Sequence, residues 1–173
     1  IERKMVSFNE FNEKLKISQI IADLSDNNVA LVSDAGTPLI SDPGYKLVRE
    51  AIAKGIKVES IPGSTAVIAA LTVSGLPPDK FLFLGYLPKK DQKRKNLLKN
   101  LFTILQSMGD KELRSTVIFF ESPYRLVKTL NDIESVFGDV DILICRELTK
   151  LHEEIRREKV SGSIEYFNIH SPK

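Results

Sequence analysis

The stretch VALVSDAGTPLISDPG, residues 29–44, decides the fold that the sequence predicts. Its first part, Val29 to Val32, is an apolar run of the length expected for a strand buried on both faces. A turn-rich loop follows, and Asp42-Pro43-Gly44 then has the composition of a helix start, with an N-cap aspartate before a proline. In open parallel sheets, ligands bind beyond the carboxyl ends of the strands. The stretch therefore predicts a strand, a loop placed to meet a ligand, and a helix.

The loop itself contains residues suited to binding a polar ligand, namely Ser33, Asp34, Gly36 and Thr37. Asp34 can accept hydrogen bonds from hydroxyls or amines, and Gly36 lets the backbone approach a ligand because it has no Cβ. The loop has neither GxGxxG nor GxxxxGK[ST], which argues against a phosphate-binding loop. A turn and a helix cap with no ligand have the same composition, so the loop alone leaves both interpretations open.

Strands and helices alternate along the 173 residues, which predicts an α/β fold built from parallel βαβ units. A further strand is expected at Lys57 to Ile61, and the charged segment from Leu151 to Glu158 is expected to be helical. The proline-containing link Gly75 to Asp79 is the best domain boundary. We therefore expect a parallel-sheet N-terminal domain over residues 1–76 and a mixed-sheet C-terminal domain over residues 77–173.

Composition narrows the class of protein. Cys145 is the only cysteine, so no intrachain disulfide can form, which suits a reducing cytoplasm. With only His152 and His170 beside it, a zinc site is not expected, and no other metal is expected either. No run is long enough to cross a membrane and no signal peptide is visible, so we expect a soluble cytoplasmic protein.

Four strand-end loops are polar, and parallel strands would bring several of them to one crevice; these loops are residues 33–38, 62–65, 121–125 and 146–150. Ser64 and Thr65 lie at an expected helix N-terminus, where free N–H groups bind polar or anionic atoms, although simple capping explains them equally well. Glu121 can face a ligand or form a structural ion pair with Arg125. A general base can come from Glu147, His152, Glu153 or Glu154. Equally, Glu153 and Glu154 can form a solvated helix face with Arg156 and Arg157.

The segment Lys89 to Lys99 has a local charge of +5 in a chain whose net charge is +2; it contains Lys89, Lys90, Lys93, Arg94, Lys95 and Lys99 against Asp91 alone. A basic helix neutralises backbone phosphates and adds salt-dependent affinity without reading sequence. The alternative is a solvated helix face. Because the charge is almost all of one sign, we expect Lys89, Lys90, Lys93, Arg94 and Lys95 to contact RNA.

Five motifs in order resemble one known group of proteins; they are SDAGTPLISDPG, IPGSTA, FLGYLP, FFESPYRL and CRELTKLHEE. Together they closely resemble the ribosomal RNA small subunit methyltransferase I group within the tetrapyrrole methylase superfamily. The resemblance covers the chain from about Ser7 to its tail. It implies two α/β domains with an S-adenosylmethionine site in the cleft between them, and a homodimer. The implied reaction is methylation of the ribose 2′-oxygen of a cytidine in 16S ribosomal RNA.

The resemblance also assigns site residues. Its first cofactor loop falls on Ser33, Asp34, Gly36 and Thr37, although Ser33 and Ala35 stand where many relatives have Gly and Pro. A second cofactor turn falls on Ser64, Thr65 and Ala66, and the remaining cofactor contacts fall on Glu121 and Arg146. We take Glu121 and Glu147 as candidates for the catalytic base. The family's first strand, its ATPIGN-type loop and its last strand have no counterpart in the sequence, so an incomplete cofactor site is expected.

Two other functions fit the same residues. One is methylation of a small tetrapyrrole by a protein of the same fold, against which the basic segment and the SDAGTP variant argue. The other is a non-catalytic RNA-binding fragment, which a missing cofactor loop would allow.

Overall fold

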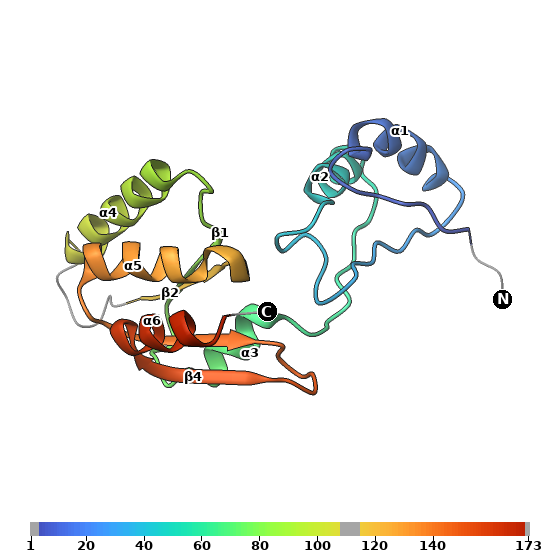
Figure 1. Cartoon of the computed structure of the whole chain (residues 1–173). Helices are drawn as coiled ribbons and strands as arrows, with labels where there is room; N and C mark the ends of the chain where they lie inside the picture. The colour runs from blue at the N-terminus through green and yellow to red at the C-terminus, as the bar shows by residue number, and fades with distance from the viewer. Residues whose placement is uncertain (1–3, 108–114, 172–173) are drawn as a thin grey trace. The chain divides into compact units, whose positions relative to one another are not determined.

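The computed structural model describes residues 4–107 and 115–171 (Figure 1). The chain separates into two compact units, Ile1–Thr65 and Ala66–Lys173. Both a parallel and an antiparallel strand pair are present, and helices pack around them, so the chain has the predicted α/β class. No helix in the described ranges is both long enough and apolar enough to span a lipid bilayer.

The N-terminal unit is built on two helices, α1 (Glu13–Asp23) and α2 (Tyr45–Ala53). Ile20 and Ile21 of α1 pack against Leu47 and Ala51 of α2, and these four buried side chains form the core of the unit. The partly buried residues Phe8, Ile17, Leu24 and Ile56 close around this core.

Two asparagines shape the turn that precedes helix α1. The Asn9 side-chain oxygen accepts hydrogen bonds from the N–H groups of Phe11, at 3.0 Å, and Asn12, at 3.1 Å. The Asn12 side-chain oxygen accepts in return from the Asn9 N–H at 2.8 Å. Asparagine side chains that bond to nearby backbone compete with helix formation, so the first helical residue is Glu13.

The strands expected at Val29 to Val32 and at Lys57 to Ile61 are not present: the described residues 4–65 contain no strand. Val32 and Ile61 are exposed. A strand is stable only when its backbone N–H and C=O groups pair with a neighbouring strand, and neither segment has such a neighbour in this unit. The prediction of a parallel sheet in the N-terminal domain is therefore wrong for the described residues, and the parallel strand pair lies in the C-terminal unit.

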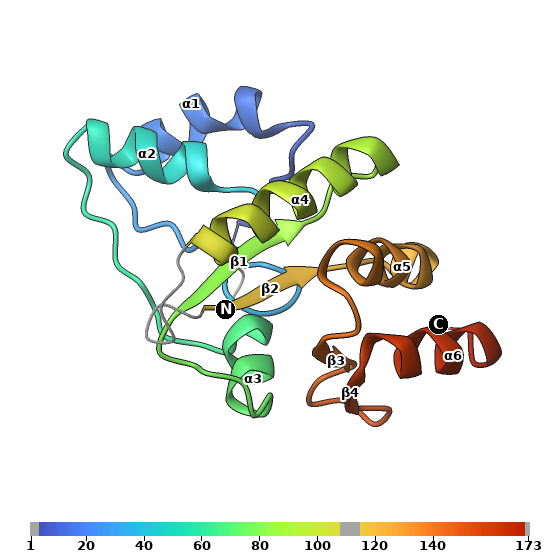
Figure 2. The same cartoon turned by 90° about the vertical axis from the view of Figure 1, so that its left-hand side faces the viewer.

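The C-terminal unit contains the remaining elements, in the order α3 (Ala66–Thr72), β1 (Phe81–Tyr86), α4 (Asp91–Ser107), β2 (Thr116–Phe120), a 3₁₀ turn (Pro123–Arg125), α5 (Leu126–Phe137), β3 (Asp141–Arg146), β4 (Glu154–Lys159) and α6 (Val160–Ile169). Strands β1 and β2 are parallel, with Phe81 opposite Thr116. Figure 2 shows the arrows of β1 and β2 pointing the same way. Strands β3 and β4 are antiparallel, with Asp141 opposite Lys159.

One apolar cluster holds this unit together. It joins the end of β1 to helices α4, α5 and α6 through Leu87, Leu98, Leu130, Ile133, Val160 and Phe167, all of which are buried. The ring of Phe102 on α4 meets that of Phe137 on α5 edge to face, with centroids 5.4 Å apart. The loop after β1 and the helices that flank it are therefore fixed to one core.

The prediction of a helix from Leu151 to Glu158 is wrong, because β4 occupies Glu154–Lys159 and α6 follows it. The segment is rich in Glu, Lys and Arg, which favour helix when no other interaction decides. Here the apolar strand β3 supplies a partner ladder, and Ile155 lies opposite Cys145. Tertiary pairing thus overrides the local preference.

Candidate functional site

The first and second predicted cofactor loops meet in the N-terminal unit. The Thr37 hydroxyl donates a hydrogen bond to the Ser64 carbonyl at 3.0 Å. Gly36 has a φ of +72°, and a Cβ there would lie 3.6 Å from the same carbonyl. The Ser33 hydroxyl closes the loop by donating to the Gly36 carbonyl at 2.9 Å. Two segments almost thirty positions apart in sequence therefore form one polar surface.

This surface has unoccupied hydrogen-bonding groups. Asp34 is exposed, and its carboxylate makes no hydrogen bond or ion pair with any residue that the structure describes. The Ser64 hydroxyl is likewise exposed and unpaired among those residues. Thr65 ends the N-terminal unit and Ala66 begins α3 in the next. Asp34 and Ser64 can therefore accept or donate hydrogen bonds to a ligand without first breaking internal ones.

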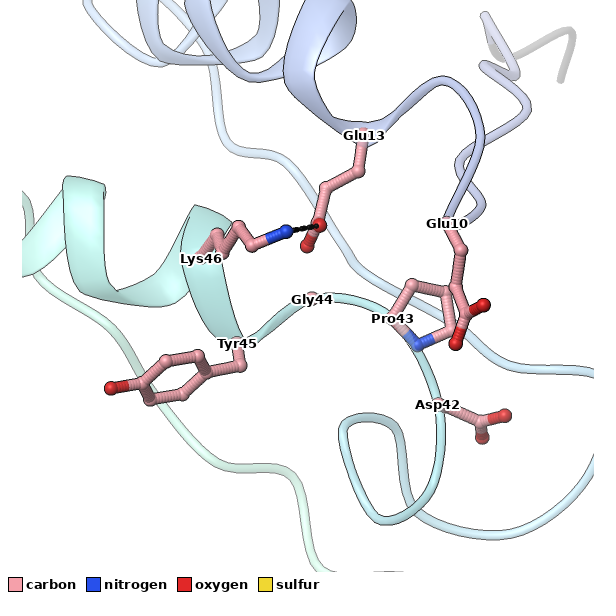
Figure 3. A pocket seen from close by; sticks show the side chains of 7 residues that line it. All are labelled: Glu10, Glu13, Asp42, Pro43, Gly44, Tyr45 and Lys46. Atoms are coloured by element: carbon pink, nitrogen blue, oxygen red, sulfur yellow. Dashed lines mark hydrogen bonds and ion pairs between the residues drawn. The ribbon is translucent and has the colours of Figure 1, made fainter. Parts of the chain in front are cut away.

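A hollow lies beside the N-terminus of α2 (Figure 3). The helix begins at Tyr45 with Gly44 as its N-cap, so the predicted start at Asp42-Pro43 is wrong. It is lined by Glu10, Glu13, Asp42, Pro43, Gly44, Tyr45 and Lys46. The Lys46 ammonium contacts the Glu13 carboxylate at 2.8 Å, and this hydrogen bond lowers the pKa of Glu13. Backbone N–H groups of Gly44 and Lys46 lower it further. The carboxylate of Glu13 thus ties the start of α1 to the N-terminus of α2, which is a structural task.

Two residues of this loop have backbone conformations that only glycine adopts freely. Leu39 has a φ of +73° and Ser41 a φ of +64°. Each such residue costs about 1–3 kcal/mol and persists only when its surroundings hold it in place. The loop from the SDAGTP motif to α2 is therefore a strained connection.

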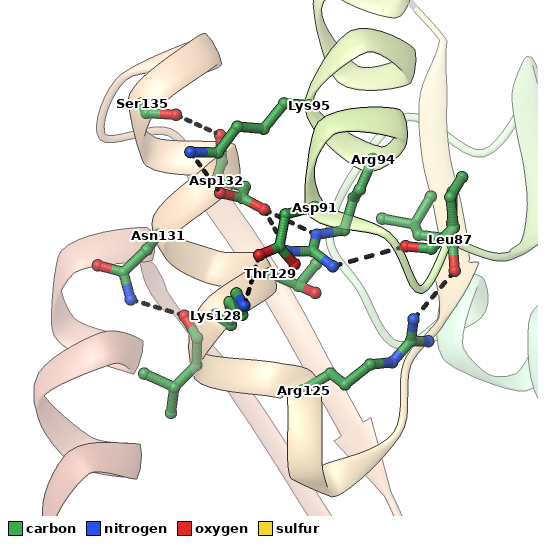
Figure 4. A network of polar contacts seen from close by, with 12 residues as sticks. Leu87, Asp91, Arg94, Lys95, Arg125, Lys128, Thr129, Asn131, Asp132 and Ser135 are labelled. Carbon is green, nitrogen blue, oxygen red and sulfur yellow. Dashed lines mark hydrogen bonds and ion pairs between the residues drawn. The ribbon is translucent and has the colours of Figure 1, made fainter.

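Glu121, predicted at the end of a strand, lies just after β2 and is engaged on all sides. Its side chain is 4% exposed and forms an ion pair with Arg125. One carboxylate oxygen accepts from the Ser122 N–H at 2.7 Å, and the other accepts from the Thr129 hydroxyl at 2.7 Å. Arg125 also donates to the Leu87 carbonyl at 3.2 Å (Figure 4). Glu121 therefore braces the start of α5, as the ion-pair alternative expects.

The loop Arg146 to Lys150 joins β3 to β4 at the tip of a hairpin. Arg146 is tied to Glu154, whereas Glu147 is 45% exposed. Among the described residues, the Glu147 carboxylate contacts the Lys150 ammonium alone, at 3.2 Å. Glu147 and Thr149 have φ values of +50° and +67°. Glu147 is thus an accessible carboxylate on a strained loop, in contrast to Glu121.

The basic segment divides into a buried part and an exposed part. Arg94 is fully buried, and its guanidinium contacts the Asp132 carboxylate at 2.6 Å and the Asp91 carboxylate at 3.1 Å (Figure 4). It does not lie on the surface expected to contact RNA. Lys95 lies 3.4 Å from Asp132, which offsets part of its charge.

The exposed positive charge therefore comes from the remaining lysines. Lys89, Lys90 and Lys93 are exposed and form no ion pair with a described residue. The surface that can meet phosphates is narrower than the sequence predicts. Asp91, the one acid among these lysines, is held by Lys128 at 2.6 Å, and this contact lowers its pKa.

Sequence reasoning missed a second hollow, in the C-terminal unit. It has a volume of about 600 Å³ and is lined by Tyr86, Leu87, Lys89, Ser122, Tyr124 and Arg125. A signal was available: the tyrosine of the GYLP motif ends one predicted strand and that of the ESPYR motif follows another, and ligand-binding residues gather at strand ends. Asp132 was also missed, although an aspartate beside Leu130 and Ile133 on the apolar face of a helix indicates a buried partner.

Comparisons with known proteins identify the family. The family described as Tetrapyrrole (Corrin/Porphyrin) Methylases matches residues 2–162. Ribosomal RNA small subunit methyltransferase I of Thermotoga maritima is 45% identical over 173 residues, which are 99% of this chain and 73% of that protein. Proteins of the same name from Halalkalibacterium halodurans and Synechocystis are 42% and 41% identical over 96% and 100% of this chain. The chain spans 55% and 60% of the length of those two relatives. The chain belongs to the tetrapyrrole methylase family.

Proposed function

We propose that this chain is the methyl-transferring part of an S-adenosylmethionine-dependent enzyme that modifies the RNA of the small ribosomal subunit. The observation that carries the proposal is the 45% identity to a relative named for that activity, of which this chain covers 73%. Family membership over residues 2–162 supports the methyltransferase class independently of any one relative. A tetrapyrrole substrate is the competing proposal, since the description of the matching family names it.

The loop around Asp34 fits S-adenosylmethionine. The cofactor supplies a methyl group on a positively charged sulfur, which is already activated for displacement. The unpaired Asp34 carboxylate suits its hydroxyls or amino group, and Gly36 leaves the backbone open for close approach. Ser33, Thr37 and Ser64 supply further polar atoms on the same surface. Thr65 is a proposed contact on the resemblance. Ala66, Glu121 and Arg146 are proposed contacts on the resemblance alone.

The proposed acceptor is the ribose 2′-oxygen of a cytidine in 16S ribosomal RNA. A bond forms between that oxygen and the methyl carbon while the carbon–sulfur bond breaks, and the hydroxyl proton leaves to a base. Positioning the two reactants dominates such a displacement, and a base adds to it. Glu121 and Glu147 are the candidate bases. A homodimer and a cytoplasmic location belong to the same proposal.

The test is a methylation assay with labelled S-adenosylmethionine on 30S subunits, naked 16S ribosomal RNA and a porphyrinoid. Transfer to 30S subunits supports the proposal, and mapping of the labelled nucleotide identifies the atom. Transfer to the porphyrinoid alone would replace the proposal by a tetrapyrrole activity. Calorimetry without substrate separates both from an RNA-binding fragment, which would not bind S-adenosylmethionine.

Replacing Asp34 with asparagine is expected to weaken S-adenosylmethionine binding by roughly 10- to 150-fold. A hydrogen bond to a charged group is worth about 1.5–3 kcal/mol, and the exposed carboxylate has no internal partner whose loss would disturb folding. Calorimetric titration of both proteins measures the change. Asp42→Asn is the matched control, because Asp42 is an exposed acid of the same loop region outside the Thr37–Ser64 contact. Equal losses in both variants would contradict a specific role for Asp34.

Replacing Lys89, Lys90 and Lys93 together with glutamine is expected to flatten the salt dependence of RNA binding. Each phosphate contact contributes about 0.7 to the slope of log K against log salt for single strands, so the slope should fall by about 2. Filter binding at several salt concentrations measures it. Lys95→Gln is the control and should change the slope less than any one of the three, because Asp132 lies 3.4 Å from Lys95. An unchanged slope in the triple variant rejects the RNA surface.

A further inference from the structure

The hollow of the C-terminal unit combines aromatic, cationic and hydroxyl groups. Tyr86, Tyr124, Lys89, Arg125 and Ser122 line it together with Leu87. Its volume of about 600 Å³ is within the range of ~300–1,000 Å³ that is typical of ligand pockets. The sequence did not predict that residues of the basic segment and of a strand-end loop would line one hollow. Its composition calls for a ligand with a flat face and a negative charge.

The walls of the hollow are held in place by contacts outside it. The ring of Tyr86 packs against that of Phe120, with centroids 5.6 Å apart. Arg125 is fixed from two sides, by the buried Glu121 carboxylate and by the Leu87 carbonyl. The wall is therefore in position before a ligand arrives, which lowers the entropy lost on binding.

Tyr124 supplies an exposed aromatic ring beside this wall. It lies in the short 3₁₀ turn Pro123–Arg125, and its side chain is 98% exposed. An aromatic ring that contacts so little of its own unit contributes almost nothing to the core. Beside a hollow that holds a second tyrosine, it is a free stacking surface.

The charges favour a nucleic acid. Lys89 is exposed and has no ion-pair partner among the described residues, and it continues the exposed lysines at positions 90 and 93. The Ser122 hydroxyl also makes no hydrogen bond with a described residue. Unstacked RNA bases bind to aromatic side chains while lysines neutralise the adjoining phosphates. A base inside a duplex has both faces covered by its neighbours and cannot stack on Tyr124.

We propose that this hollow binds one unstacked nucleotide of single-stranded RNA, with the base on Tyr124 and the adjoining phosphate at Lys89. The inference rests on the proposed function, since it assigns a nucleotide subsite to the RNA substrate. It adds a base-binding surface to the phosphate contacts of the lysines. Phosphate contacts bind RNA of any sequence or pairing, whereas a stacking subsite favours RNA with locally unpaired nucleotides.

The test compares Tyr124→Ala and Tyr124→Phe with the unaltered full chain. Equilibrium binding of a fluorescently labelled oligocytidylate is expected to weaken roughly 5- to 150-fold in Tyr124→Ala, as expected for the loss of one stacked base. Tyr124→Phe keeps the ring and should bind like the unaltered chain. Phe11→Ala is the matched control, because Phe11 is 96% exposed but lies in the other unit. A blunt RNA duplex of equal length should bind Tyr124→Ala and the unaltered chain alike.

Circular dichroism and thermal unfolding of the same samples check that each variant is folded. Equal oligocytidylate affinity in Tyr124→Ala and the unaltered chain overturns the subsite, and so does an equal loss on the duplex. If 30S subunits are still methylated in either case, the proposed function stands while the subsite fails. If the unaltered chain methylates no RNA and binds none, the proposed function and the subsite both fail.

Discussion

Replacing Arg94 with alanine is expected to lower the free energy of unfolding of the C-terminal unit by about 3–5 kcal/mol. The guanidinium is fully buried and contacts the carboxylate of Asp132, whose side chain is 7% exposed. Removing it leaves that carboxylate in a poorly solvated position, with only the Lys95 ammonium at 3.4 Å. An unpaired buried charge is among the few defects that cost this much. Denaturant unfolding followed by circular dichroism measures the loss.

The neighbouring residue provides the control. Lys93 is exposed on the same helix, and Lys93→Ala should change stability by about 0.5 kcal/mol or less. Hydrogen exchange should place the loss in α4 and α5, which the pair joins, and leave α1 and α2 unchanged. Arg94→Lys should recover little, because one ammonium cannot replace a fork that reaches Asp132, Asp91 and the Pro88 carbonyl.

A double replacement separates charge from packing. Arg94→Met combined with Asp132→Leu removes both charges and fills similar volume, so it should restore much of the stability that Arg94→Ala loses. If Arg94→Ala were as stable as Lys93→Ala, the buried pair would not hold the two helices together. The burial of Arg94 also predicts its effect on RNA binding. Replacing Arg94 should not reduce the slope of log K against log salt in the way that replacing Lys89, Lys90 and Lys93 does.

Apolar runs in this chain form strands only where a partner strand lies in the same unit, among the residues that the structure describes. The runs FLFLGYL, TVIFF and DILIC predict strands, and the structure has β1, β2 and β3 there. The run VALV has the same local character but no partner ladder in the described residues, so it is irregular. Strand β4 shows the reverse case, since charged residues that favour helix pair with β3. Whether a segment pairs with another strand depends on residues far away in the sequence, so its local composition does not predict the pairing.

The candidate site was predictable in part. The loops SDAGTP and IPGST were predicted to lie close together because both would follow parallel strands. Thr37 does contact Ser64. Those strands are not formed, so the contact rests on the loops themselves. The burial of Arg94 was not predicted, because a helix with many lysines has the composition of a solvated face. Only the position of Asp132 on the apolar face of α5 could have revealed it.

Replacing Glu147 with glutamine is expected to slow single-turnover methylation of 30S subunits by roughly 10²- to 10⁴-fold, the usual contribution of a general base. The structure favours this carboxylate over Glu121 for the role. Glu147 is 45% exposed and can reach a substrate, whereas Glu121 is 4% exposed and already accepts from Ser122 and Thr129. Glu121→Gln should instead lower the stability of the C-terminal unit, because Arg125 loses its buried counter-charge.

Glu153→Gln is the matched control for the loop. Glu153 accepts a hydrogen bond from the Thr149 N–H at 2.7 Å, and a glutamine oxygen can accept the same bond. The loop geometry is therefore kept while one nearby charge is removed. A rate loss shared by Glu147→Gln and Glu153→Gln would point to the charge of the loop rather than to proton transfer. An unchanged rate in Glu147→Gln, with a large loss in folded Glu121→Gln, would move the base to Glu121. Unchanged rates in both would mean that positioning alone drives the transfer, as an already activated methyl group permits.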